Sequence, residues 1–196
     1  MEGTDQRARI LAAALDLIAN QGLDGMTMRQ LAAACDLNIA TLYHYVSGKA
    51  ELISAIVEER HYDEGLANLE LPIDPALPPR TRLSALMMHV GRAGRGELRL
   101  WRLLIGEGLR DDPVARDEAA RLSSLLGAAA NGWLTKLFPE LEPDQLGPVA
   151  SVVTAQLLAW FLEEMLRGPG ADERLMIRAS ATANVVFPRP PSSSPF

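Results

Sequence analysis

The spacing of hydrophobic and polar residues along the chain predicts helices and no strands. Apolar side chains recur at every third or fourth position, which is the period of an amphipathic α-helix, and the valine-rich runs fall inside such patterns. The predicted helices cover residues 5–21, 28–35, 39–46, 48–68, 80–95, 97–105, 113–137, 149–167 and 172–186. We therefore predict an all-α fold.

The stretch over residues 27–49 has the signals of two short helices joined by a tight turn. Thr27 and Gln30 are spaced as a capping box, in which each side chain bonds the backbone of the other residue. Asp36 tolerates the left-handed backbone of a sharp corner, and Asn38 is a good cap for the second helix. A helix, a three-residue turn and a second helix form a helix-turn-helix.

The second short helix would be marginal alone, so one of its sides must pack inside a three-helix head that also contains the helix over residues 5–21. Helical spacing predicts an inner side formed by Ile39, Leu42 and Val46. The other side and its flanks carry a methyl, a hydroxyl, an imidazole and two phenols, from Ala40, Thr41, His44, Tyr43 and Tyr45. These side chains suit the major groove of DNA, where Thr bonds base edges and methyl groups contact thymine.

A phosphate-binding feature follows this helix. Ser47-Gly48-Lys49 opens the next helix, whose free N–H groups and dipole, together with the Lys49 ammonium, would attract a backbone phosphate. From these residues alone, an ordinary pair of core helices without any DNA contact remains an open alternative.

The segment TLYHYVSGKAEL resembles the signature of the tetracycline-repressor (TetR) family, T-L-Y-x-[HY]-[FV]-x-x-K-x-x-L, and MTMRQLAAACDL resembles the helix before it. The resemblance covers about the first fifty residues, and the commoner family residues differ at Asp36, Val46 and Gly48. It implies a helical C-terminal domain that binds a small molecule and pairs with a second subunit through its last two long helices. It also implies base or phosphate contacts from Arg29, Ile39, Ala40, Thr41 and Tyr43, and phosphate contacts from Tyr45 and Lys49.

The charge of the chain is the property that fits DNA binding least. The net charge is −6, and residues 1–60 contain five basic and eight acidic residues, a net charge of −3. Non-specific attraction to phosphates should therefore be weak, so that a focused basic edge has to supply it. The candidates for this edge are Arg7, Arg9, Arg29 and Lys49.

The rest of the chain is interpreted as a second, helical domain. Four prolines between residues 69 and 80 exclude a helix interior there, and GRAGRG weakens the end of the helix that follows. Residues 149–162 are apolar on nearly all sides, which is consistent with burial on one side in the domain and on the other in a homodimer. We predict a helix-turn-helix DNA-binding domain over residues 1–47, an α-helical effector-binding and dimerisation domain over residues 48–187, and a disordered tail over residues 188–196.

Three tryptophans on three different predicted helices allow two interpretations. For any single tryptophan, a place in an aromatic core is the expected role. The alternative is a largely apolar ligand pocket with a few polar groups, since Gln156 interrupts an apolar stripe and needs a hydrogen-bond partner. The candidate ligand-binding residues are Met87, His89, Trp101, Trp133, Gln156 and Trp160.

Catalytic, metal-binding and membrane-spanning patterns are missing from the sequence. It contains no Gly-rich phosphate loop, HExxH, CxxC or GxSxG, and its three histidines are scattered, so we expect no enzyme, no cofactor and no metal site. The single cysteine, Cys35, excludes an intrachain disulfide and fits a reducing cytoplasm. The apolar runs are shorter than the roughly 20 residues of a membrane span, and no secretory signal is recognised near Met1.

We predict a cytoplasmic, ligand-responsive transcriptional regulator, most simply a repressor. It would bind a palindromic double-stranded DNA operator as a homodimer, with two heads about 34 Å apart, and leave it when a small, largely apolar effector binds. One alternative is a regulator that has no effector or that activates transcription. The other is a helical small-molecule-binding protein or enzyme with a vestigial DNA-binding head, which the acidic head favours.

Overall fold

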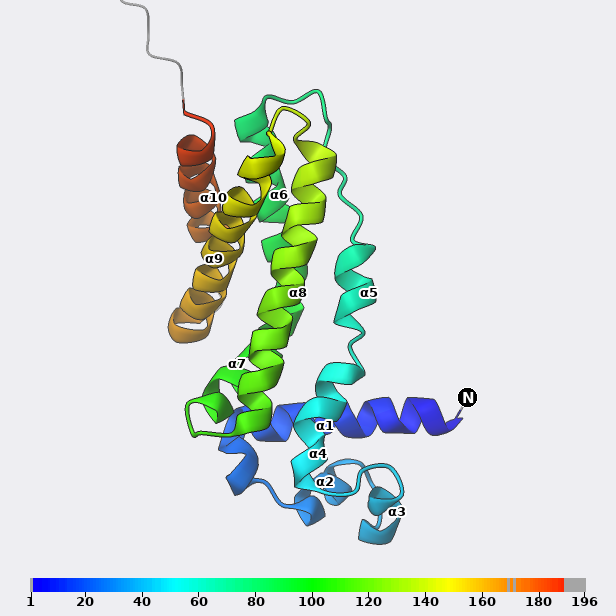
Figure 1. The fold of residues 1–196 in the computed structure, drawn as a ribbon. Coiled ribbons are helices and arrows are strands. Elements are labelled where there is room, and N and C mark those ends of the chain that lie inside the picture. Colours follow the sequence, from blue (N-terminus) through cyan, green and yellow to red (C-terminus); the bar gives the residue numbers. More distant parts are fainter. Residues whose placement is uncertain (1, 169, 171, 189–196) are drawn as a thin grey trace, which may run out of the picture. The chain divides into compact units, whose positions relative to one another are not determined.

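The computed structural model describes residues 2–168, 170 and 172–188, and all regular structure in these residues is helical (Figure 1). The predicted all-α class is confirmed. The predicted disordered tail lies outside the described residues apart from Pro188. The helices are α1 (Glu2–Gly25), α2 (Met28–Ala34), α3 (Ile39–Tyr43), α4 (Lys49–Glu58), α5 (Tyr62–Ala67), α6 (Pro79–Gly94), the 3-10 turn η1 (Arg95–Glu97), α7 (Leu98–Gly108), α8 (Pro113–Leu137), α9 (Pro143–Arg167) and α10 (Glu173–Val186).

The described chain divides into two compact units. The first contains the chain up to residue 66 together with residues 97–124, and the second contains residues 67–96 together with the chain from residue 125. The predicted head over residues 1–47 falls wholly within the first unit, which also contains α4, α7 and the first half of α8. The predicted boundary after residue 47 separates a DNA-binding from an effector-binding domain, and this functional division stays a prediction.

Helix α1 is central to the first unit, where it packs against α2, α4 and α7. Its inner stripe contains the fully buried side chains of Ile10, Ala14 and Ile18, as its amphipathic pattern predicts. Gly22 has φ 78° and ψ 162°, a backbone conformation that favours glycine, and it interrupts the helical path at the predicted end of this helix. The chain therefore turns at Gly22 towards α2.

The fourth helix differs from its prediction. A continuous helix over residues 48–68 was expected, but α4 ends at Glu58 and α5 begins at Tyr62. Between them, His61 has φ 47°, which is left-handed for a non-glycine residue. The prediction was wrong because the helical pattern of the sequence runs through this break without a local stop signal.

In the second unit, α6 packs closely against α9 and α10. The helix predicted over residues 80–95 is present as α6, which continues through Gly91 to Gly94, and the 3-10 turn η1 follows where GRAGRG suggested a break. A Cβ atom at Gly91 would lie 2.6 Å from the Leu175 side chain of α10, and one at Gly94 would overlap the Phe161 ring of α9. These glycines therefore allow the helices to approach each other.

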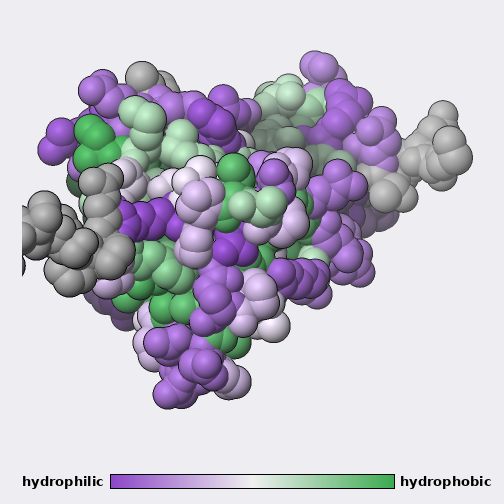
Figure 2. All heavy atoms as spheres, turned by 90° about the horizontal axis from the view of Figure 1, so that it is seen from above, coloured by the Kyte–Doolittle hydropathy of each residue, from purple (hydrophilic) through white to green (hydrophobic). Residues whose placement is uncertain are grey.

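Helix α9 is apolar on two sides. Val153, Leu157 and Trp160 on its inner side are buried in the second unit. By length and composition α9 could cross a membrane, but an inner face of this kind is also usual for a core helix. Its outer side and the neighbouring side of α10 leave large apolar side chains exposed, namely Val152, Leu162, Leu166, Met176, Ile177 and Val185. Figure 2 shows apolar groups (green) reaching the surface between hydrophilic ones (purple) on the face that it presents.

Candidate nucleic-acid interface

Helix α2 begins with the predicted capping box. The Gln30 N–H donates to Thr27 Oγ1 at 3.1 Å, and the Thr27 N–H donates to Gln30 Oε1 at 2.7 Å. Met26 before the cap and Leu31 after it are fully buried. The local sequence thereby fixes where α2 starts and satisfies two N–H groups that a helix end leaves without partners.

The turn between α2 and α3 also follows its prediction. Asp36 has φ 55°, and the Leu37 N–H closes the corner by donating to the Ala32 carbonyl at 2.9 Å. Asn38 Oδ1 accepts the Thr41 N–H at 2.7 Å and caps α3. Helix α3 ends at Tyr43 and not at residue 46, since the chain continues as a turn that is bonded to the Leu42 carbonyl.

The side chains of α3 and its turn separate into a buried and an exposed set. Leu42 and Val46 are buried, as expected for the side that faces the head. Ala40 and His44 are exposed, Tyr43 is 50% exposed, and Thr41 and Tyr45 are half-buried. Ile39, which spacing alone assigned to the inner side, is 37% exposed, so that assignment was wrong. The first residue of a helix this short has no preceding turn to cover it.

The ammonium of Lys49 has partners within the protein. Lys49 Nζ donates to the Leu23 carbonyl at 2.9 Å and to the Asp24 carbonyl at 3.2 Å, both in the last residues of α1, after its kink at Gly22. An ammonium has three donors, so one remains for a phosphate at the start of α4. Gly48 supplies no side-chain cap there. Lys49 is thus held in position beside the exposed N–H groups of α4.

The basic edge that the sequence suggested is smaller in the structure. Arg7 pairs with Glu59 at 2.5 Å, and Arg9 donates to Gln6 at 3.2 Å. Arg29 is exposed on α2 and has no hydrogen bond or ion pair among the described residues. Arg9, Arg29 and Lys49 therefore keep charges that no carboxylate among the described residues neutralises, whereas Arg7 is paired.

Sequence reasoning missed one residue that supports the head. Glu107 of α7 is buried, and its Oε1 accepts the Leu23 N–H at 3.1 Å and a bond from Arg110 at 3.1 Å. The available signal was a carboxylate at helical spacing from the buried Leu103 and Leu104. A carboxylate on an apolar stripe needs a buried partner, but the sequence does not name which one.

The candidate ligand residues are distributed over both units. Met87, Trp133 and Trp160 are buried in the second unit, where His89 and Gln156 are half-buried. Trp101 is half-buried on α7 in the first unit. Gln156 Oε1 accepts a bond from Arg178 at 2.7 Å and lines an open groove of about 500 Å³ between α9 and α10. The buried indole Nε1 of Trp160 and hydroxyl of Thr154 have no hydrogen-bond partner among the described residues.

A capped pair of helices joined by a tight turn, with an exposed second helix, is a helix-turn-helix, an arrangement that many DNA-binding proteins use. The family model described as "Bacterial regulatory proteins, tetR family" matches residues 10–56. The uncharacterised HTH-type transcriptional regulator in the dhlA 5' region of Xanthobacter autotrophicus is 30% identical over 164 residues, 81% of this chain and 74% of that protein. The chain belongs to the TetR family of DNA-binding transcriptional regulators.

Two further proteins resemble this chain, one over part of its sequence and one over its whole fold. The class D tetracycline repressor of Escherichia coli is 38% identical over 63 residues, 31% of this chain, and the match spans only 29% of the repressor's length. The solved structure of AibR in complex with isovaleryl coenzyme A and operator DNA has a TM-score of 0.57 at 21% identity, covering 93% of this chain and 98% of AibR. The likeness to AibR concerns the whole fold.

Proposed function

We propose that this regulator is a repressor that binds a palindromic operator as a homodimer and releases it when a small molecule binds the helical body. The observation that carries the proposal is the exposed face of α3, held by two caps and by the buried Leu42. In functional terms, residues 1–47 would bind DNA, and residues 48–187 would bind the effector and the second subunit. The protein would act in the cytoplasm, where its operator is.

On this proposal, the residues of α3 divide into base and phosphate contacts. Thr41 and His44 offer hydrogen-bonding groups to base edges, and Ala40 offers a methyl group to thymine. Ile39 and Tyr43 add apolar and aromatic surface beside them. Tyr45, Lys49 and Arg29 would bind phosphates and set the register of the head on the duplex.

The outer side of α9 and α10 supports the dimer. Six large apolar side chains on these two helices are 42% to 78% exposed, and several such groups together favour association. An isologous interface uses the same surface on both subunits, so this face would pack on its own copy. A symmetric dimer explains why a palindrome would be read.

The second unit supports a small-molecule site. Trp160 Nε1 and Thr154 Oγ1 are buried polar atoms that have no hydrogen-bond partner in the part of the chain that the structure describes, whereas buried polar atoms are usually hydrogen-bonded. Both are buried residues of α9, and Met87 of α6 and Trp133 of α8 are buried in the same unit. A largely apolar effector with hydrogen-bond acceptors would satisfy these donors. His89, Gln156 and Trp101 are further candidates, and AibR, a protein of similar fold, carries isovaleryl coenzyme A in its complex.

The test is selection of bound duplexes from a random DNA pool by the full-length protein, followed by sequencing and sedimentation. Enrichment of one palindrome with half-sites one helical turn apart, bound by two subunits, is the expected result. A compound screen against that duplex then tests release. Failure to enrich any duplex at low salt would reject the proposal and favour a helical small-molecule-binding protein, whereas a palindrome that no compound releases would favour a regulator without an effector.

A further inference from the structure

The break between α4 and α5 depends on one residue in an unfavourable conformation. The Arg60 N–H donates to Val57 and the His61 N–H to Glu58, both at 3.2 Å, so α4 ends in a tightened turn. His61 then has φ 47°. Residues with a Cβ atom are disfavoured in this left-handed region, so the local conformational preference of His61 does not explain the break.

The sequence around the break favours an unbroken helix. Residues 48–68 follow one helical pattern, and between Lys49 and Tyr62 they contain no proline and no glycine. The first N–H groups of α5 also lack acceptors in a preceding turn, which a continuous helix would supply. An interaction from elsewhere in the first unit must therefore stabilise the broken form.

That interaction comes from Glu97, which binds both neighbours of His61. Arg60 Nη1 donates to the two carboxylate oxygens of Glu97, at 3.1 Å each, and the Tyr62 hydroxyl donates to Oε2. Burial and the carboxylate of Glu97 raise the pKa of the Tyr62 phenol well above its ordinary value, so the hydroxyl stays a donor. One carboxylate thus holds the residues on both sides of the strained position.

We propose that Glu97, Arg60 and Tyr62 form a latch that holds α4 and α5 apart, and that opening it lets α4 continue into α5 and changes operator affinity. This regulation rests on the proposed DNA-binding function. A two-state element of this kind is what coupling between an effector and a distant head requires. The latch adds a defined switch between α4, which follows the DNA-reading helix, and the rest of the chain.

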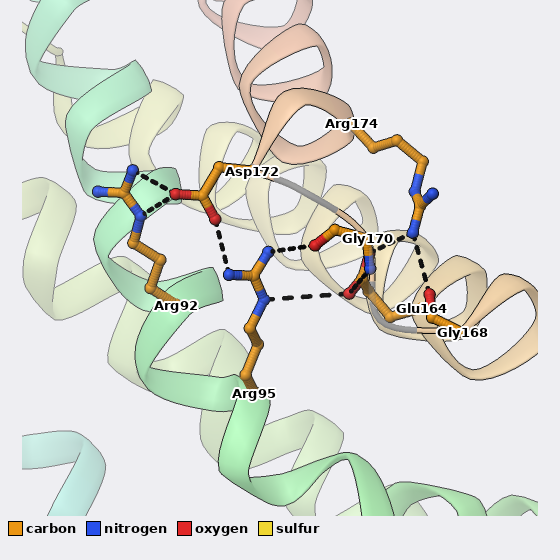
Figure 3. A network of polar contacts seen from close by, with 7 residues as sticks. All are labelled: Arg92, Arg95, Glu164, Gly168, Gly170, Asp172 and Arg174. Carbon is orange, nitrogen blue, oxygen red and sulfur yellow. Dashed lines mark hydrogen bonds and ion pairs between the residues drawn. The ribbon is translucent and has the colours of Figure 1, made fainter.

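A signal can reach the latch along the backbone. Arg95, two residues before Glu97 in the same 3-10 turn η1, is bound within the second unit (Figure 3). Its guanidinium pairs with Asp172 at 2.6 Å and with the buried Glu164 at 3.9 Å, and it lies 5.5 Å from the centre of the Trp160 ring. A change in the packing of α9 or α10 would therefore act on η1 and, through Gly96, on the carboxylate of Glu97.

Hydrogen exchange of the full-length protein tests the latch without DNA. In Glu97→Ala and in His61→Ala, the amides of residues 62–64 should exchange more slowly, by about tenfold or more, because they gain acceptors in a continuous helix. His61→Gly should keep them as fast as in the unchanged protein, since glycine tolerates φ 47°. Glu64→Ala removes an exposed α5 carboxylate that has no hydrogen bond or ion pair among the described residues. It is the control and should also leave the exchange of residues 62–63 unchanged.

Operator affinity then tests the regulation, on the duplex selected from the random pool. Glu97→Ala and His61→Ala should shift the dissociation constant in one direction, by about fivefold or more, while His61→Gly shifts it the other way or not at all. Unchanged exchange in both alanine variants overturns the latch. Altered exchange with unaltered affinity overturns its role in regulation. If neither the unchanged protein nor any variant binds a duplex, the proposed function fails, and the exchange measurement still decides whether the latch exists.

Discussion

The carboxylate of Glu107 on α7 accepts the backbone N–H of Leu23, 84 positions earlier in the chain, at 3.1 Å. On the other side of the same residue, the Leu23 carbonyl accepts a bond from Lys49 of α4 at 2.9 Å. The last residues of α1, which lead into the helix-turn-helix, are therefore held by a carboxylate from α7 and an ammonium from α4. We expect the position of α3, the proposed DNA-reading helix, to depend on both contacts.

Replacing Glu107 should weaken both folding and operator binding. Glu107→Ala removes the acceptor of the part-buried Leu23 N–H, which should cost about 1 kcal/mol of stability. Glu107→Gln keeps a carbonyl oxygen at the same place and should recover most of the loss. Thermal unfolding and operator titration of both variants check this prediction. Equal losses in the two variants would show that the hydrogen bond to Leu23 is not the reason.

Thr41 and Lys49 should affect DNA binding in different ways. Thr41→Ala should weaken discrimination at one base position by about 1–3 kcal/mol, because it would remove the proposed base contact. Lys49→Ala should weaken binding to specific and random duplexes alike, reduce the salt dependence, and lower stability by about 1 kcal/mol through the Leu23 and Asp24 carbonyls. Competition titrations with single-base variants of the operator, at several salt concentrations, separate the two. An unchanged base preference in Thr41→Ala would contradict the assignment.

Charge on the outer side of α9 and α10 should separate the subunits. Leu162→Asp and Ile177→Asp place a carboxylate on the exposed apolar face, and burying an unpaired charge in an interface is strongly unfavourable. Both variants should sediment as monomers and bind the operator at least tenfold more weakly. Leu109→Asp is the matched control, since Leu109 is 81% exposed after α7 in the first unit. Dimers in both variants would place the interface elsewhere.

The ion pairs of Asp172 in Figure 3 should make the stability of the protein fall at low pH. Hydrogen bonds from Arg92 and then Arg95 lower the pKa of the Asp172 carboxyl in the folded protein. A lowered pKa contributes stability that is present above the unfolded-state pKa, about 3.9, and is lost as the pH falls through the folded-state value. Urea midpoints measured from pH 6 down to pH 3 should therefore fall less steeply below about pH 4 in Asp172→Asn. Parallel curves for the two proteins would contradict this.

The sequence by itself determined the helices whose limits depend on near neighbours. The Thr27–Gln30 box, the Asp36 corner and the Asn38 cap involve residues at most five positions apart, so propensity and spacing were sufficient to predict them. The exposed face of α3 followed from the same periodicity, except at Ile39, where the helix has no earlier turn. The class of protein was therefore accessible from about fifty residues.

Only the tertiary structure decided the features that depend on distant residues. The sequence pattern continues through His61, and Glu97, 36 positions later, binds the residues on both sides of the break. The carbonyl partners of Lys49 and the acceptor of the Leu23 N–H were equally invisible in the sequence. The sequence can indicate that a charged side chain on an apolar stripe will need a partner. Which partner it has is set by the packing of helices that are far apart in the chain.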